Sequence, residues 1–566
     1  MDTILAEKKL LVEAATGVKK ADLVLKNADF YNVFTRRIEH GDIAVTAGKV
    51  VGIGSYDGEK ELDLTGKLVA PGFVDAHIHL ESSLVSPAQF AKAVVPHGTT
   101  CVVTDPHEIT NVMGTDGIEY MLAATEGLPL DVRFVLPSCV PATPLDEAGA
   151  ELSWEDIDRF YADRRVLGLA EMMNAFGVVH NDPAVLSKIA AADGHGRVTD
   201  GHAPGIAGKE LDAYIAAGVG SDHECSDADE ALEKLRRGQY IMIREGTAAR
   251  NLKALTPLLQ EVYADRCLFC TDDKHPSDLL ELGHIDYIIR EAVRYGADPL
   301  TCIRAATWNA AQYFRMYDRG AIAPGYLADF TVLDSISSLQ VVMTVKNGKI
   351  VCENGRLIDF AVPRIEKRLE EHAHNTFRLQ PLAASDFPDG VQRGIIGMVP
   401  GEIVSTDNGR TDKPDLGRDI LKIAVLERHK NTGHIGLGYI QGYGLKSGAV
   451  ATSISHDSHN IIVVGATAED MAFAANQIIK NCGGICIVQD GQVLGEVKLE
   501  IAGLMSDTDL HEINAALEAA KDAAYALGVN HGIDPFMTLS FMSLPVIPTL
   551  RLTTKGMVDV LTQQFI

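Results

Sequence analysis

The chain has 566 residues, of which 46% are hydrophobic and 23% charged, and its net charge is -26 at pH 7. This length predicts two or three domains, and the negative charge argues against a nucleic-acid partner, because few cationic groups are left over to neutralise phosphates. No apolar run approaches the ~18 residues of a membrane span, and the first ten residues lack the apolar core of a signal peptide. The scattered cysteines are typical of a protein whose thiols stay reduced. We therefore expect a cytoplasmic protein without a membrane partner.

Short strands separated by turns are predicted near the start of the chain and again after residue 325. Glycine and Asx residues separate these apolar runs, as they do between β-strands. The runs are Ala21–Leu25, Asp42–Thr46, Lys49–Ile53, Ala328–Leu333 and Val341–Val351. The simplest interpretation is one small β-sandwich domain built from both flanks, residues 1–68 and 325–375, around a segment whose ends lie close together.

Eight strand-like runs, most followed by a plausible helix, occupy the segment between these flanks. They are Lys67–Val74, Thr99–Thr104, Val132–Leu136, Val166–Ala170, Gly196–Thr199, Gly218–Ser221, Tyr240–Ile243 and Cys267–Thr271. Eight alternating β/α units over about 250 residues are typical of a (β/α)₈ TIM-like barrel, which we assign to residues 69–324. An open doubly wound sheet is the alternative, but no G-x-G-x-x-G follows any strand. The predicted fold class is α/β.

Polar side chains capable of acid–base or metal chemistry stand at the ends of most of these strands. Strand by strand they are His77 and His79, then Asp105, His107 and Glu108, then Glu171, His202 and His223, then Arg244 and Glu245, and finally Asp272 and Asp273. The carboxyl ends of barrel strands meet on one face, where the chemistry of this fold takes place. We expect these side chains to converge there.

Four histidines and two carboxylates in this set have the ligand chemistry of a metal site. Nitrogen and oxygen ligands without thiolate admit zinc, manganese or iron. Six protein groups are too many for one open tetrahedral ion, so a two-metal site with one bridging carboxylate fits better. Such a site makes hydroxide at neutral pH for attack on an electrophilic carbon. Asp272 is placed to take the proton and hand it to a leaving nitrogen.

The motif from Pro71 to His79, Pro-Gly-Phe-Val-Asp-Ala-His-Ile-His, resembles the opening motif of the amidohydrolase superfamily. The segment Gly320–Asp329 resembles the boundary of the second domain in the same group. Many members bridge their metals with a carbamylated lysine at the end of strand four, where this chain has Glu171. That departure resembles the bacterial adenine deaminases, as do the motifs around His107, His202, His223 and Asp272.

Residues 385–566 extend the resemblance beyond the barrel. They have an α/β composition of their own, and adenine deaminases carry a similar additional C-terminal domain. The motif His456-Asp457-Ser458-His459 lies there between two strand-like runs. Three interpretations are open: it closes the barrel mouth, which we favour, it is a separate metal site, or it caps a turn. Under the first, His456, Asp457 and His459 are tentative substrate contacts.

The resemblance implies a function and a set of ligands. His77, His79, Glu171, His202, His223 and Asp272 would hold two divalent ions, Mn²⁺ or Fe²⁺ first and Zn²⁺ second. A hydroxide bridging the metals would attack C6 of adenine and release ammonia and hypoxanthine, a reaction of purine salvage. The group that protonates the purine ring is open: Glu108 and His107 are candidate catalytic residues, and Asp105 and Glu245 are candidate substrate contacts.

Two rival functions remain at this point. One is an amidohydrolase that deacetylates an N-acetyl amino sugar, and the other is a metal-free amidohydrolase-like scaffold. The complete ligand set argues against the scaffold. Many soluble enzymes of this size are symmetric oligomers, so we expect a homodimer.

Overall fold

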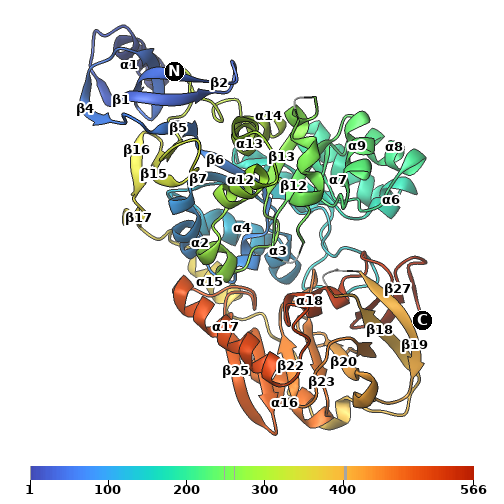
Figure 1. The fold of residues 1–566 in the computed structure, drawn as a ribbon. Coiled ribbons are helices and arrows are strands. Elements are labelled where there is room, and N and C mark those ends of the chain that lie inside the picture. The colour runs from blue at the N-terminus through green and yellow to red at the C-terminus, as the bar shows by residue number, and fades with distance from the viewer. Residues whose placement is uncertain (1, 248, 261, 401–403) are drawn as a thin grey trace.

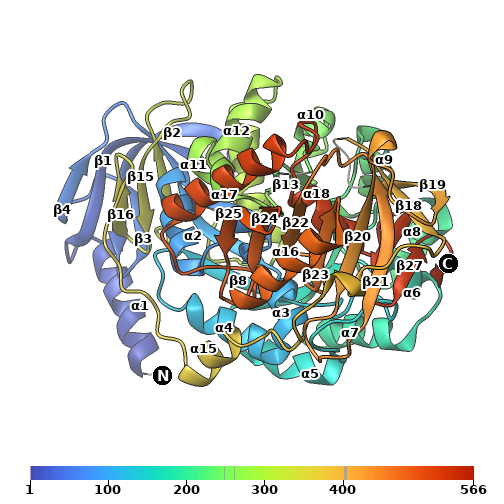
Figure 2. The same ribbon diagram turned by 90° about the horizontal axis from the view of Figure 1, so that it is seen from below.

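The computed structural model describes residues 2–247, 249–260, 262–400 and 404–566. A sheet built from both flanks, a barrel and a C-terminal α/β region follow one another across the molecule (Figure 1). Seen from below, the C-terminal region lies across one end of the barrel, and the flanking sheet lies to its side (Figure 2). Among the helices described, none is both long and apolar enough to cross a membrane.

The flanking sheet joins segments that precede and follow the barrel in the chain. Nine strands pair in the order β17-β16-β15-β14-β5-β1-β2-β3, with β4 on β1. Their bounds are β1 Ala21–Asn32, β2 Arg37–Thr46, β3 Lys49–Gly54, β4 Gly58–Asp63, β5 Leu68–Pro71, β14 Phe330–Leu333, β15 Val341–Lys346, β16 Lys349–Glu353 and β17 Arg356–Leu357. The pairing of β5 with β14 brings the start and the end of the barrel segment together. Helix α1 (Asp2–Ala15) packs on β2 and β3.

Eight parallel strands form the barrel. They are β6 Phe73–Ile78, β7 Thr99–Thr104, β8 Asp131–Leu136, β9 Val166–Met172, β10 Val198–Gly201, β11 Ser221–Asp222, β12 Tyr240–Arg244 and β13 Cys267–Cys270. Two runs of paired strands, β10 to β6 and β11 to β13, are joined by bridges from Thr199 to Val219 and from Ile78 to Asp272. Most of their residues are buried, because helices cover the outside of a parallel barrel. The expected α/β barrel is confirmed.

The run Lys67–Val74, expected as the first barrel strand, is divided between two sheets. Leu68–Pro71 is β5 of the flanking sheet, and the barrel strand β6 begins at Phe73. Between them a Cβ on Gly72 would lie 2.2 Å from the Thr100 hydroxyl, so only glycine allows this close passage. The barrel strand therefore extends further toward His77 than the sequence pattern indicated.

Helices follow the strands around the barrel (Figure 1). Their bounds are α2 Pro87–Val94, α3 His107–Met113, α4 Thr115–Ala124, α5 Trp154–Asp158, α6 Ala175–Val179, α7 Pro183–Gly194, α8 Gly208–Ala216, α9 Ala228–Arg236, α10 Leu252–Leu255, α11 Pro276–Glu281, α12 Ile285–Arg294, α13 Pro299–Arg304 and α14 Ala310–Tyr313. Helix α15 (Lys367–Ala373) lies in the connection to the C-terminal region.

The C-terminal region has a sheet of its own, in the order β19-β18-β21-β20-β23-β22-β24-β25. The strands are β18 Arg393–Met398, β19 Ser405–Thr411, β20 Ile420–Leu426, β21 Ile435–Gln441, β22 Ala449–Thr452, β23 Ile461–Gly465, β24 Gly484–Gln489 and β25 Gln492–Lys498. The helices are α16 Ala468–Lys480, α17 Leu510–Ala526 and α18 Met537–Ser540, and a small sheet holds β26 Leu550–Thr553, β27 Gly556–Asp559 and β28 Gln564–Phe565.

The two faces of this C-terminal sheet pack in different directions. Ala449 and Ala451 of β22 pack with Met471 and Ala475 of α16. Val450, between them, points to the other face and joins the large apolar cluster that includes barrel residues. Successive strand residues alternate between faces, so β22 links helix α16 to the barrel side.

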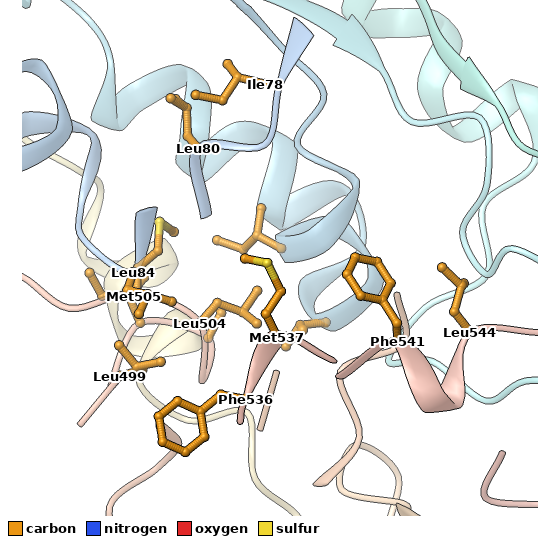
Figure 3. Close-up of a cluster of buried hydrophobic side chains, with 14 of the residues drawn as sticks. Ile78, Leu80, Leu84, Leu499, Leu504, Met505, Phe536, Met537, Phe541 and Leu544 are labelled. Carbon is orange, nitrogen blue, oxygen red and sulfur yellow. The ribbon is translucent and has the colours of Figure 1, made fainter. Parts of the chain in front are cut away.

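An apolar interface fixes the C-terminal region to the barrel. Leu84, which follows β6, lies beside Met505 of the C-terminal region, in one cluster with Met537 and Phe541 (Figure 3). Backbone hydrogen bonds support this contact: Ser86 N donates to Ser506 O at 2.8 Å, and Ser506 N donates to Leu84 O at 3.0 Å. The C-terminal region is therefore held next to the strand end that carries His77 and His79.

Candidate active site

Two histidines at the end of β6 open the site. His77 is the fifth residue of the strand and His79 follows it, so both imidazoles point to the same side. Their Nε2 atoms lie 3.2 Å apart. The Nδ1 atom of His79 lies 3.1 Å from the carbonyl oxygen of Asp105, an acceptor that fixes the proton on Nδ1 and leaves a lone pair on Nε2.

Glu171, at the end of β9, divides its two carboxylate oxygens between two pairs of histidines. Oε1 lies 3.3 Å from His79 Nε2 and 4.0 Å from His77 Nε2. Oε2 lies 2.9 Å from His202 Nδ1 and 3.2 Å from His223 Nε2. One carboxylate therefore faces both halves of the site, as a bridging ligand must.

Asp272 completes the half of the site that contains His77 and His79. Its Oδ1 lies 3.1 Å from His79 Nε2 and 3.8 Å from His77 Nε2. The backbone secures this position, because Asp272 N donates to His77 O at 2.9 Å and His79 N donates to Asp272 O at 3.3 Å. Strands β13 and β6 thus set the distance between this carboxylate and the two imidazoles.

The six side chains fit a pair of divalent metal ions. Ligands bound at ~2.1 Å around a tetrahedral ion stand roughly 3.4 Å from one another. The separations among these donor atoms, from 2.9 to 4.0 Å, are of that size. All six residues are buried, and they belong to groups of donors close enough to share an ion. Imidazole and carboxylate donors without thiolate suit Mn²⁺, Fe²⁺ and Zn²⁺.

Both carboxylates stay ionised in this setting. Burial would raise the pKa of Glu171, but hydrogen bonds from His202, His223 and His79 hold it well below its usual range. Burial is likewise outweighed at Asp272, where the charges of Arg244 and His79 hold the pKa far below normal. The site therefore offers two negative charges to cations.

His107 is oriented by its neighbour in the turn after β7. Its Nδ1 lies 2.8 Å from Asp105 Oδ2, while its buried Nε2 has no hydrogen-bond partner among the residues described. That nitrogen lies 3.5 Å from Glu108 Oε1 and 3.8 Å from Asp457 Oδ1. Asp105 and His107 thus form a dyad on the wall of the site.

The C-terminal motif reaches this wall. His456 Nδ1 lies 2.8 Å from Glu108 Oε1, and His459 Nε2 hydrogen-bonds to the other oxygen, Oε2. Burial would raise the pKa of Glu108, but His456, His459 and His107 together hold it well below its usual value. This position agrees with closure of the barrel mouth. A separate metal site is not tested, since donor atoms of Glu108, His456 and His459 lie close enough together to share an ion.

A small cavity lies at the centre of these groups. The residues that line it come from both regions of the chain: His79, His107, Glu108, Glu171, Met173, His202, His223, Glu224, Arg244, Gly246, Ala249, Thr271, Asp272, Asp273, His456, Asp457, Phe541, Leu544 and Ile547. Its polar side belongs to the barrel, and Phe541, Leu544 and Ile547 of the C-terminal region give it an apolar wall. A flat heteroaromatic substrate matches such a lining.

Arg244 and Glu224 are site residues to which the sequence analysis gave no role. Arg244, at the end of β12, donates from Nη1 to Asp272 Oδ2 and to Glu224 Oε1, and from Nη2 to Glu224 Oε2 at 3.1 Å. Glu224 Oε1 also lies 3.4 Å from His223 Nε2. Arg244 ends β12 and Glu224 stands just after β11, so their positions in the sequence pointed to the site. Position at a strand end does not show, however, which of several neighbouring polar residues faces the cavity.

Three expected substrate contacts lie outside the cavity lining. Glu245 follows Arg244, and because side chains alternate along a strand it points away and lies near Arg250 and Lys274 instead. Asp105 acts on the site through His107, and His459 acts through Glu108. The residues of these segments that line the cavity are Arg244, His107, Glu108, His456 and Asp457.

Comparisons with known proteins match both parts of the chain. Residues 68–351 match the model of the amidohydrolase family, and residues 401–564 match that of the adenine deaminase C-terminal domain. "Adenine deaminase 2" of Carboxydothermus hydrogenoformans is 48% identical over 98% of this chain and 98% of its own length. "Adenine deaminase" of Desulfatibacillum aliphaticivorans is 46% identical over 97% of each chain.

Solved structures of lower identity also resemble the chain. A β-aspartyl dipeptidase of Fervidobacterium islandicum AW-1 has a TM-score of 0.47 and 16% identity, covering 61% of this chain and 99% of that one. The sequence relatives are far more similar and extend across both matched regions. The chain belongs to the adenine deaminase family of amidohydrolases.

Proposed function

We propose that this protein catalyses the hydrolytic deamination of adenine to hypoxanthine and ammonia. Relatives named adenine deaminase, 43–48% identical over nearly the whole chain, carry this proposal. The cavity supports it, because an apolar wall from the C-terminal region faces a set of metal-binding side chains. A planar purine has the chemistry to meet one apolar and one polar wall.

Two divalent ions, Mn²⁺ or Fe²⁺ with Zn²⁺ also accommodated, are the cofactors that we assign to the site. His77, His79 and Asp272 would hold one, His202 and His223 the other, and Glu171 would bridge them. When bound, such ions lower the pKa of water and provide a nucleophile at neutral pH.

Asp272 is the residue that we assign to proton transfer from water to the leaving nitrogen. One of its oxygens faces His79, and the other accepts a hydrogen bond from Arg244, so the carboxylate cannot rotate away. Its pKa lies far below normal because Arg244 and His79 outweigh burial. It therefore holds a proton only briefly and releases it readily to the departing amine.

His107 and Glu108 stand on the purine-ring side of the cavity and are the barrel's candidate catalytic residues for the ring-protonation step, as donor or as the group that positions the donor. Attack at C6 moves an electron pair onto a ring nitrogen, which then needs a proton. Both side chains line the cavity, and Asp105 fixes the orientation of His107. Asp457, whose Oδ1 lies 3.8 Å from His107 Nε2, is a candidate contact for the substrate amine.

The remaining assignments concern the whole chain. We divide it into residues 1–68 with 325–375, residues 69–324 and residues 385–566. The pairing of β5 with β14 supports the joining of the two flanks, although it places Val69–Pro71 with the flanking sheet. We also propose a homodimer in the cytoplasm.

The test is an ultraviolet assay of adenine conversion, with ammonia and bound metal measured in parallel. The protein is assayed as purified and after reconstitution with Mn²⁺. Turnover with about two ions per chain is expected, as a two-metal site requires. N-acetylglucosamine 6-phosphate serves as the rival substrate, and its phosphate would need a cationic partner. Among the described residues that line the cavity, Arg244 is the one Lys or Arg, and it is already paired with Asp272 and Glu224. Turnover of the sugar alone would contradict the proposal.

A further inference from the structure

We propose that the C-terminal region supplies a catalytic residue: His456, held through Nδ1 by Glu108 of the barrel, donates the proton that N1 of adenine receives. This inference rests on the proposed function and identifies the acid for its ring-protonation step. The active site would then contain catalytic residues from both the barrel and the C-terminal region.

The first observation is the geometry of the Glu108–His456 pair. Nδ1 of His456 lies 2.8 Å from Glu108 Oε1 as an ion pair, so Nδ1 faces the carboxylate and Nε2 is the ring nitrogen left to meet a substrate. Within the residues described, Nε2 of His456 makes no hydrogen bond to protein, and it is not fully enclosed. The side chain lines the cavity and stacks on Phe541, with ring centroids 4.6 Å apart and an interplanar angle of 12°.

The second observation is the rigidity of the segment that carries His456. Arg428, which is fully buried, donates from Nε to His459 O and from Nη2 to Ala502 O at 2.8 Å. His429 Nε2 lies 2.7 Å from Ser458 O. Asn460 Nδ2 donates to Glu147 O of the barrel at 2.7 Å. These contacts secure the C-terminal end of the motif, and its start is held where His456 N donates to Ser540 O at 3.1 Å. His456 is therefore presented to the cavity in one position.

Charge favours the protonated form of His456. Burial lowers the pKa of this imidazole, but the Glu108 carboxylate more than compensates and raises it to about 9. The other charged or titratable groups that act on His456 or lie against it are Asp273, Asp457 and His459. Its cavities are also lined by His79, His107, Glu171, His202, His223, Glu224, Arg244, Asp272 and His275. Because Glu108 is itself held ionised, His456 is a cation at neutral pH and has a proton to give.

His107 is the nearest rival for this role, and its accessibility separates it from His456. Its Nε2 is enclosed by protein, whereas Nε2 of His456 is not. Asp105 and His107 also lie beside Glu171, with His107 Nδ1 3.6 Å from Oε1. His107 is therefore better placed to orient the ligand carboxylate than to reach a ring nitrogen.

The proton balance of the step is complete. Water adds through oxygen to C6, the electron pair of the C6–N1 double bond moves to N1, and N1 takes the proton from His456 Nε2. One water proton passes through Asp272 to the amine, and the C6–N6 bond breaks to release ammonia. The second water proton leaves to solvent as the C6 carbonyl forms, and solvent returns one to His456. Hypoxanthine keeps the proton on N1.

The experiment compares His456→Asn with the matched control His434→Asn in the metal-loaded full chain. The amide of Asn can still donate to Glu108 but cannot transfer a proton. His434 lies at the same interface, where its Nδ1 is 3.0 Å from Glu147, and it has no part in the cavity. We expect kcat to fall by roughly 100- to 10,000-fold in His456→Asn, the usual contribution of a general acid, with unchanged metal content and thermal midpoint. His434→Asn should match the wild type.

The pH profile gives a second readout. Wild-type kcat should fall as the pH rises through about 9, because His456 then loses its proton. His456→Asn should lack this basic limb. Glu108→Gln should shift it to lower pH, because the carboxylate that stabilises the imidazolium is gone. Glu108→Gln also serves as the test if His456→Asn does not fold.

Three outcomes would overturn the inference. The first is a His456→Asn rate within threefold of the wild type. The second is a loss explained by missing metal. The third is removal of the basic limb by His107→Asn but not by His456→Asn. Failure of the proposed function is distinguishable from these, because the wild-type protein itself would then not convert adenine.

Discussion

Arg244 donates a hydrogen bond to Oδ2 of Asp272, whose other oxygen lies 3.1 Å from Nε2 of His79. The guanidinium also binds both oxygens of Glu224. A single cation thus holds two buried carboxylates, one at the reacting atoms and one beside His223. The orientation of Asp272 depends on a residue that touches neither the histidines nor the bridging carboxylate.

The first prediction concerns Arg244→Lys. An ammonium group cannot reproduce the planar fork that binds both carboxylates at once, so one buried charge is left unpaired. We expect kcat/KM to fall by roughly 10- to 100-fold, as for other groups that orient metal ligands. The melting temperature should fall as well. Arg250→Lys, at an exposed pair with Asp278, is the control, and equal effects in the two variants would contradict a special role for Arg244.

A second prediction concerns the bridge. Glu171→Gln keeps the size of the side chain but removes the charge shared between the two histidine pairs. We expect the variant to bind less metal and to lose most of its activity while the fold is retained. Metal analysis and circular dichroism check this, with the exposed Glu151→Gln as control. Two ions per chain and full activity in Glu171→Gln would place the bridge elsewhere.

A third prediction concerns Asp272→Asn. The amide retains an oxygen toward His79 but cannot accept a proton. We expect metal to be retained and kcat to drop by about two to four orders of magnitude, the range of general acid–base catalysis. Steady-state rates and metal content, measured on the same sample, decide the matter: near-normal turnover would assign the proton transfer to another group.

A fourth prediction concerns acid stability at a site away from the cavity. Burial opposes ionisation of Asp286, but hydrogen bonds from His97 and Arg290 prevail and lower its pKa to about 2. Because the folded pKa lies below the unfolded value, the stabilisation is present above pH 4 and is lost as the pH falls toward 2. It amounts to about 2 kcal/mol at neutral pH.

Asp286→Asn should therefore lower the thermal midpoint of the metal-free protein at pH 7. The difference from the wild type should shrink between pH 4 and pH 2. Differential scanning calorimetry across this range measures it, and metal-free samples remove the effect of acid on ligand binding. A difference that stays constant with pH would show that charge is not the cause.

Much of the architecture could be predicted from the sequence, because apolar strand-like runs that alternate with helical patterns indicate the strands of a barrel. The predicted family and fold class are confirmed. The six expected ligands lie together because each follows a strand whose end faces the same side of the barrel. Their roles as metal ligands remain predictions.

What the sequence could not provide depends on contacts between distant segments. Glu245 and Arg244 are neighbours in the chain. Successive side chains along a strand point to opposite faces, so the register of β12 decides which of the two faces the cavity. Phe541, Leu544 and Ile547 look like ordinary core residues until the C-terminal region is placed against the barrel. The division at Gly72 depends on Thr100, a residue that comes 28 positions later.

The position of His456 and Phe541 along the chain sets an order of assembly during synthesis. The ribosome releases His77 through Asp272 long before the residues that cover them. The nascent barrel can thus present its imidazoles and carboxylates to solvent before the C-terminal region has been made. When the C-terminal region then packs against the barrel, it covers these side chains and completes the wall of the cavity.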